Sequence, residues 1–206
     1  MICDLKYIYI YIDNQICRGK LINSNLYKYT NTTSSPVPIQ ERAMVVFTYA
    51  DEFTSPVSPA RLFKALILDA RNLIPKIIPS VVTSIEIVEG DGLSAGSIRK
   101  INFVEGSEVK CVKNLVEEVD EENFIYRYSM IEGEALILEK VGKISYEVKF
   151  EERAEGGSLN KMTSIYYTKG DVVLSQEEIT AGKGKALAIY KIVEGYLLQN
   201  PHAYAN

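Results

Sequence analysis

The stretch KISYEVKFEERAEGGSLNKMTSIYYT, residues 143–168, decides the fold class of this chain. Its first nine residues alternate between apolar side chains and serine, lysine or glutamate, as in a strand with one buried and one solvated face. The glycines at 156–157 mark a turn, and SLNKMTSIYYT returns as a second strand. The apolar face of the first strand consists of Ile144, Tyr146, Val148 and Phe150.

The sequence before this hairpin contains more segments of the same kind, which predicts a meander of antiparallel strands. In EVKCVKNLVEEV the apolar positions change phase, which predicts a β-bulge. In FIYRYSMIE, Phe124, Tyr126, Tyr128 and Met130 share one face. The strand candidates are about 45–55 in MVVFTYADEFTS, SIEIVEG (84–90), SIRKINF (97–103), EVKCVKNLVEEV (108–119) and FIYRYSMIE (124–132).

Three helices complete the expected architecture. Ser58 and Pro59 are an N-cap and a first helical residue, and a second short helix near 71–78 ends before a proline. Ser175 and Glu178 form a capping-box pattern that opens a long amphipathic helix over about 176–200. One long helix against one curved antiparallel sheet is an α+β fold, and such a sheet leaves room for an internal cavity.

Composition narrows the function classes. The chain has 206 residues and a net charge of -4, which favours a single domain and gives no reason to expect nucleic acid as a partner. No apolar run approaches the roughly 20 residues of a membrane span. The three cysteines fit a reducing compartment, and with His202 as the only histidine we expect neither a metal site nor a cofactor. The same scarcity removes the usual base of a serine or cysteine hydrolase.

Residues 1–43 differ from the rest in composition. KYIYIYID alternates like a strand but no hairpin partner follows it, and NTTSSPVPIQ is a polar linker. We expect an unstructured or weakly structured extension, interpreted as translated leader sequence with Met44 as the functional start. The alternative is a targeting or regulatory arm.

The glycine-rich stretch GDGLSAGSIRK, residues 90–100, raises the question of a phosphate loop. Its glycines, Gly90, Gly92 and Gly96, match neither the Walker nor the dinucleotide spacing, and a strand rather than a helix follows. We therefore expect a mobile strand-to-strand loop without a catalytic role. Its backbone N–H groups leave open a weak anion nest beside Arg99 and Lys100.

Several long stretches in this order resemble the plant class-10 pathogenesis-related proteins, the superfamily of the birch major pollen allergen. The resemblance covers residues 44–206. It implies a helix-grip (START-like) fold, in which seven antiparallel strands, two short helices and a long C-terminal helix enclose a hydrophobic cavity. The matching stretches are VFTYADEFTS, ARLFKALILDARNLIPKIIP, IEIVEGDG, IRKINFVEGS, EEVDEENFIYRYSMIEGEAL, KISYEVKF, GGSLNKMTSIYYTKGD and VEGYLLQNPHAY.

The resemblance also implies a function and a site. It indicates a non-catalytic binding or carrier protein in plant defence, for a small hydrophobic ligand such as a flavonoid, cytokinin, brassinosteroid or abscisic-acid-like hormone. It makes Arg99, Tyr126, Tyr128 and Tyr146 ligand contacts, and the alternation of apolar positions independently puts the three tyrosines together. The alternative is that these aromatic side chains pack a filled core. Further wall residues would be Ile101, Phe103, Leu66, Met162, Tyr166 and Lys183.

The chain departs from the family pattern in places that bear on other activities. The glycine loop is one residue longer, and Gly142 stands where a glutamate proposed for ribonuclease activity is typical, although Glu194 and Tyr196 match the rest of that proposal. A ribonuclease, or an enzyme of specialised metabolism that uses Lys183, is the alternative function. Phosphatase inhibition is implied only by distant analogy, because the hormone receptors' gate and latch motifs are missing. We expect a monomer in the cytoplasm, with the nucleus as a second compartment.

Overall fold

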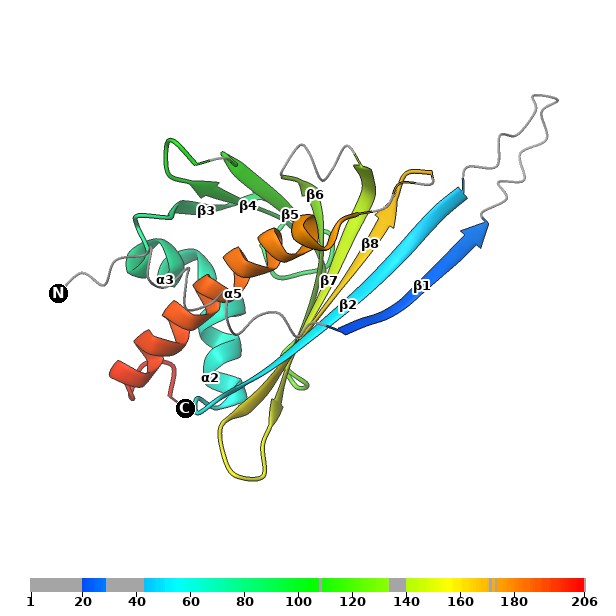
Figure 1. The fold of residues 1–206 in the computed structure, drawn as a ribbon. Helices are drawn as coiled ribbons and strands as arrows, with labels where there is room; N and C mark the ends of the chain where they lie inside the picture. The colour runs from blue at the N-terminus through cyan, green and yellow to red at the C-terminus, as the bar shows by residue number, and fades with distance from the viewer. Residues whose placement is uncertain are drawn as a thin grey trace.

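The structure, a computed structural model, describes residues 20–28, 43–107, 109–133, 140–170, 172 and 174–205; side chains are described except those of 20–28, 43–44, 176–183 and 185. One antiparallel sheet curves around a long helix, with short helices at one end of the concave side (Figure 1). In chain order the elements are β1 (Lys20–Lys28), β2 (Ala43–Ser55), α2 (Pro59–Phe63), the π-helical turn η1 (Lys64–Leu68), α3 (Ala70–Ile77), β3 (Val82–Glu89), β4 (Ile98–Phe103), β5 (Cys111–Asp120), β6 (Ile125–Glu132), β7 (Val141–Glu152), β8 (Ser158–Thr168) and α5 (Gln176–Gln199).

The expected α+β helix-grip architecture is confirmed. Strands β2 to β8 supply the seven antiparallel strands, and the full sheet has the order β1-β2-β8-β7-β6-β5-β4-β3. The β5–β6 pairing shifts register between Val116 and Glu118, which is the bulge that the phase change predicts. The long helix begins directly after Ser175, as the capping pattern predicts, while the Glu178 side chain lies outside the described part.

Within the extension that the sequence predicts to be unstructured or weakly structured, residues 20–28 form the strand β1. Its register runs antiparallel to β2, from Lys20 opposite Ala50 to Lys28 opposite Ala43. The physical reason is that β2 would otherwise be an edge strand with a row of unpaired backbone groups, which any β-compatible segment within reach can pair. The alternating stretch KYIYIYID lies outside the described residues.

The helices pack through apolar side chains onto one end of the concave face. Val193 and Leu197 of α5 have no exposed surface, and Phe63 of α2 is 1% exposed. The Phe63 ring meets the Phe150 ring of β7 edge-on, with 6.1 Å between centroids. Burial of such side chains stabilises the fold by about 1.5–3 kcal/mol each.

Polar groups fix the same end of the molecule. Asn160, which is 1% exposed, donates to the Tyr190 hydroxyl at 2.8 Å. Arg61 of α2 donates to the main-chain carbonyl oxygens of Leu197, Asn200 and Ala203, all at or beyond the end of α5. A cation that donates to orphan carbonyls there is favourable to the helix dipole as well.

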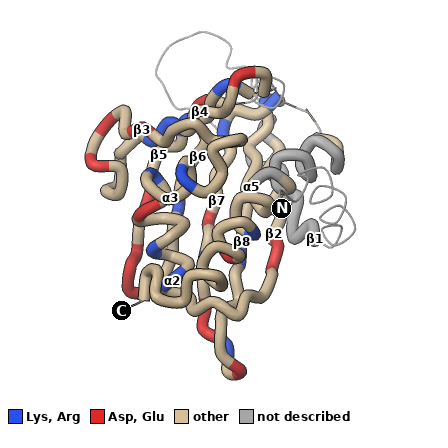
Figure 2. The backbone as a smooth tube through the Cα atoms, turned by 90° about the vertical axis from the view of Figure 1, so that its left-hand side faces the viewer, with Lys and Arg blue, Asp and Glu red and all other residues tan. Residues whose placement is uncertain are grey.

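The convex face of the sheet, unlike the apolar end of the concave face, carries charged side chains that form ion pairs. Arg127 of β6 lies between Glu118 of β5 and Glu147 of β7, and Lys143 pairs with Glu117 at 2.8 Å. Figure 2 shows basic and acidic residues interspersed along the backbone. On β6 and β7, alternation therefore places the charged Arg127, Lys143 and Glu147 on the convex side and the tyrosines Tyr126, Tyr128 and Tyr146 on the concave side.

Candidate ligand-binding site

Neighbouring strands bring the predicted tyrosines together at the middle of the concave face. Tyr128 of β6 lies directly opposite Tyr146 of β7, and Tyr166 of β8 lies opposite Ile144. Side chains of residues two apart share a face, so Tyr126 joins them. The face alternation that the sequence predicts is confirmed here by the strand register.

The aromatic rings form a continuous stack. Tyr126 and Tyr128 have centroids 4.9 Å apart with an interplanar angle of 22°, and Tyr128 and Tyr146 are 4.8 Å apart at 16°. The guanidinium carbon of Arg99 lies 5.4 Å from the Tyr126 centroid, within cation–π range. The stack of three near-parallel tyrosine rings therefore has the positive charge of Arg99 at one end.

Main-chain carbonyl groups hold Arg99 in place. Its Nε donates to the carbonyl oxygen of Gly92 in the glycine loop, and its Nη1 donates to that of Ile67 at 3.0 Å. Ile67 lies in the last turn of η1, where carbonyl groups lack partners within the helix. Arg99 is 8% exposed, so a buried charge is held by neutral dipoles rather than by a carboxylate.

The hydroxyls of Tyr126, Tyr128 and Tyr166 stay neutral. Burial raises the pKa of Tyr126, although the charge of Arg99 acts in the opposite direction. Burial also raises the pKa of Tyr166, against a hydrogen bond with Tyr146. It raises the pKa of Tyr128 strongly, although the side chain is only half-buried by accessible surface. Neutral phenols both donate and accept hydrogen bonds, and their rings remain apolar surfaces.

The other residues that the resemblance implies for the wall fall into two groups. Met162 lies opposite Val148 on the same side of the sheet and is half-buried. Ile101, Phe103 and Leu66 pack as partly buried side chains against the main apolar cluster. The side chain of Lys183 lies outside the described part of the chain.

Strand β2 adds two residues that sequence reasoning missed. Tyr49 meets Tyr166 edge-on, with centroids 6.0 Å apart, and Asp51 lies opposite Met162 in the register. The signal was available, because Tyr49 and Asp51 have the same parity as Phe47 and Phe53 in MVVFTYADEFTS.

The glycine loop joins β3 to β4, as predicted, and its own side chains organise it. The Asp91 carboxylate accepts from the Leu93 amide at 2.8 Å and from the amide and hydroxyl of Ser94. Gly92 has a φ of +87°, a left-handed conformation that glycine adopts far more readily than other residues, and a Cβ there would push against the tip of the Ile87 side chain. These hydrogen bonds restrain the loop, whereas the sequence predicts a mobile one.

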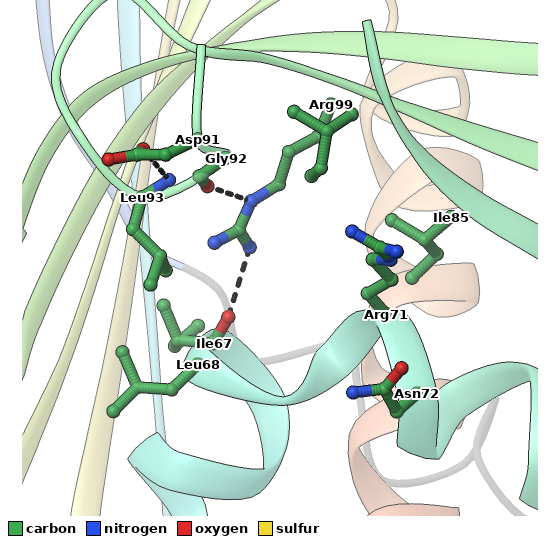
Figure 3. Close-up of a pocket in the computed structure, with 10 residues that line it drawn as sticks. Ile67, Leu68, Arg71, Asn72, Ile85, Asp91, Gly92, Leu93 and Arg99 are labelled. Carbon is green, nitrogen blue, oxygen red and sulfur yellow. Dashed lines mark hydrogen bonds between the residues drawn. The ribbon is translucent and has the colours of Figure 1, made fainter.

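A cavity of about 310 Å³ opens between this loop and the short helices (Figure 3). Arg99 forms part of its wall, so the same side chain lies beside both the tyrosine stack and this cavity. The sequence alone did not place residues of α3 in a common site with the loop.

Neither Glu194 nor Tyr196 lies within 4 Å of a Cβ placed at Gly142, the first position of the ribonuclease pattern. A Cβ added to Gly142 would have only Tyr167 and Lys169 within 4 Å. Glu194 is 8% exposed on α5 and accepts from Lys191 at 2.8 Å. An acid and a base near one phosphate, which that reaction requires, are not brought together by these residues.

No cluster of three or more histidine, cysteine, aspartate or glutamate side chains suited to a metal ion occurs among the described residues. In the same part of the chain, no helix combines the length and apolar character needed to cross a membrane.

Comparison with known proteins agrees with the architecture. The sequence pattern of the Pathogenesis-related protein Bet v 1 family matches residues 44–200. The major strawberry allergen Fra a 1-2 of Fragaria ananassa is 55% identical over 161 residues, which are 78% of this chain and 99% of that protein. The major allergen Pru ar 1 of Prunus armeniaca is 50% identical over the same shares of the two chains.

Solved structures show the same fold. Ara h 8.0201 is similar with a TM-score of 0.67 at 40% identity, over 75% of this chain and 99% of that chain. Truncated norcoclaurine synthase from Thalictrum flavum reaches 0.61 at 20% identity, over 78% of this chain and 98% of that chain, a likeness of fold alone.

Fold and site together define a helix-grip protein with an aromatic concave face. The sequence match is long enough to go further, because the family pattern covers most of the chain and relatives share half of their residues with it. The chain belongs to the Bet v 1 family of pathogenesis-related proteins.

Proposed function

We propose that this protein is a non-catalytic binding or carrier protein for small hydrophobic plant metabolites or hormones, acting in plant defence. The ligand class is a flat, amphipathic molecule such as a flavonoid, a cytokinin, a brassinosteroid or an abscisic-acid-like compound. The observation that carries the proposal is the stack of Tyr126, Tyr128 and Tyr146 beside the fixed charge of Arg99.

The surroundings of Tyr128 support a lined space rather than a filled core. Tyr128 and its neighbour Tyr146 are both only half-buried, so part of each side chain remains accessible on the concave face. Apolar walls with a few oriented hydroxyl groups are what small-molecule sites generally have.

The experiment is a calorimetric titration of the full chain with quercetin and with trans-zeatin. We expect one site at micromolar affinity for at least one of them. Tyr128→Leu removes a stacked ring and should weaken binding by about three- to tenfold, since an aromatic pair contributes about 0.5–1.5 kcal/mol beyond its buried area.

Tyr167→Leu is the matched control. Tyr167 lies next to Tyr166 in β8 and points to the other side of the sheet, so affinity should not change. Absence of binding at tens of micromolar, or equal weakening by both variants, would mean that the concave tyrosines only pack a core.

A second candidate is an enzyme of specialised metabolism. Asp51 on the concave face, opposite Met162, is the acidic group that such chemistry would need. A solved norcoclaurine synthase from Thalictrum flavum is in complex with dopamine and hydroxybenzaldehyde, and this chain shares only its fold. Incubation with such an amine and aldehyde, followed by mass spectrometry, tests it: product formation that Asp51→Asn abolishes would favour the enzyme.

The proposal also covers the setting of the protein. The low cysteine count supports a reducing compartment, so we propose that the protein acts in the cytoplasm, with the nucleus as a second location. We also propose that it is a monomer. A phosphatase partner is left out, since the motifs that would contact it are missing from the sequence. Residues 44–206 are proposed as the ligand-binding domain, because the family pattern matches residues 44–200 and the described side chains that form the core lie between Val46 and Leu197.

A further inference from the structure

The cavity beside the glycine loop has a composition of its own. Its apolar walls come from η1, β3 and the loop, and they are Ile67, Leu68, Ile85, Ile87 and Leu93. Its charged residues are Arg71 on α3, Arg99 on β4 and Asp91 in the loop. Figure 3 shows the guanidinium groups of Arg71 and Arg99 reaching the same space from opposite sides.

The two arginines differ from the basic residues of the convex face. There Arg127 and Lys143 have carboxylate partners. In the described part of the chain Arg71 has no hydrogen bond or ion pair, and Arg99 has only the two carbonyl partners, which leaves its Nη2 without one. Two guanidinium groups in one concave site therefore lack an anion.

The third charge limits what that anion can be. Asp91 is fixed in the ionised form by the hydrogen bonds from Leu93 and Ser94, which hold the pKa of its carboxyl group well below the usual range. Two positive charges and one negative charge leave a net charge of one, which suits a monoanion and disfavours a polyphosphate. The cavity volume is at the small end of the range for ligand sites.

We propose that this cavity is a binding site for a small amphipathic monoanion, an aromatic carboxylate or sulfonate. Its charged group pairs with Arg71, whose guanidinium can bind two oxygens at once, and its apolar body lies against the isoleucine and leucine walls. Arg99 supplies a second, pre-oriented charge across the cavity. The cavity lies beside the tyrosine stack and shares Arg99 with it, but Arg71 is not part of the stack, so the proposal stands whether or not the carrier function is right.

The test uses the full chain and a matched pair of probes, 2-naphthoate and the neutral 2-naphthamide, followed by calorimetry and by amide NMR. We expect naphthoate to bind about tenfold or more tightly than naphthamide at low salt, since hydrogen bonds to charged groups are the stronger kind. Its largest shifts should fall at the amides of 91–97 and of α3, and the preference should decline as salt is added. Pyrophosphate, which has charge without an apolar body, should bind more weakly than naphthoate.

Arg71→Gln should remove the preference for naphthoate, and Arg71→Lys should restore part of it. Arg71 is exposed on its helix, so both variants should keep the parent's thermal unfolding midpoint. The control is Arg153→Gln in the β7–β8 hairpin, where Arg153 pairs with Glu155 and the preference should remain.

Three results would overturn the proposal: no naphthoate binding at millimolar concentration, equal affinity for both probes, or a preference that survives Arg71→Gln. Shifts confined to the tyrosine stack would do the same. A ligand such as quercetin should still bind to Arg71→Gln, so failure of the carrier function and failure of this site remain distinguishable.

Discussion

The concave face has a closed end and a tyrosine region, and the same alternation of side chains builds both. At the closed end Phe63, Phe150 and Leu197 are 0–2% exposed and fill the space under α2 and α5. In the tyrosine region Tyr128, Tyr146 and Met162 point the same way but keep accessible surface. The alternation of side chains along each strand thus determines which of them point inward. Those covered by α2 and α5 become buried core, and those in the tyrosine region keep accessible surface.

The largest expected effect tests the closed end. Phe63→Ala should lower the free energy of unfolding by about 3–5 kcal/mol, because it opens a cavity where the ring packs against Phe124 and Phe150. Urea denaturation followed by circular dichroism measures it. Tyr128→Leu should cost less, since its ring is only half-buried. Equal losses in the two variants would remove the distinction between the regions.

A smaller effect tests the polar link between sheet and helix. Tyr190→Phe removes the hydroxyl that accepts from Asn160 and should lower the free energy of unfolding by about 1–2 kcal/mol, because a buried donor loses its partner. Tyr196→Phe, on the same helix and half-buried, is the control and should change stability by less than about 0.5 kcal/mol. If Tyr190→Phe were equally neutral, the hydrogen bond would not contribute to closing this end.

The smallest effect concerns α5 itself. Gly184→Ala should raise the free energy of unfolding by about 0.5–1 kcal/mol, because the backbone is helical and an added Cβ meets nothing within 4 Å. Gly195→Ala, equally unobstructed, should give a similar gain.

The two glycine variants should differ in dynamics. Tyr190, Val193 and Leu197 anchor the second half of α5, whereas Gly182 and Gly184 add no side-chain packing to the first half. Hydrogen exchange should therefore be faster at 178–186 than at 190–197, and only Gly184→Ala should slow it there and slow ligand exchange. Uniform protection along α5 would place the ligand entrance elsewhere, most simply between the glycine loop and the short helices.

Local patterns predicted most of this fold. The position of Pro59, the start of α5 after Ser175 and the bulge in β5 are each signalled by a few neighbouring residues. So is the shared face of Tyr126 and Tyr128. Such features depend on backbone propensity and side-chain parity, which act over short distances along the chain.

The features that the sequence did not predict depend on contacts between distant segments. Pairing of β1 with β2 depends on an edge that only the folded sheet creates. The partners of Arg99 are carbonyl groups, and carbonyl groups have no signature in a sequence. In the sequence, Arg71 is indistinguishable from any exposed helical residue. Only the packing of α3 beside the glycine loop shows that it lines a cavity.

The tyrosine stack has a spectroscopic consequence. The chain contains 14 tyrosines and no tryptophan, so phenol rings dominate its ultraviolet emission. Rings 4.8 and 4.9 Å apart are coupled, and their fixed arrangement should give a near-ultraviolet circular dichroism signal that comes largely from the concave face. A molecule that settles against those rings would alter this signal directly. The protein therefore carries an intrinsic optical probe at the position where its ligand is expected, and occupancy can be followed without any label.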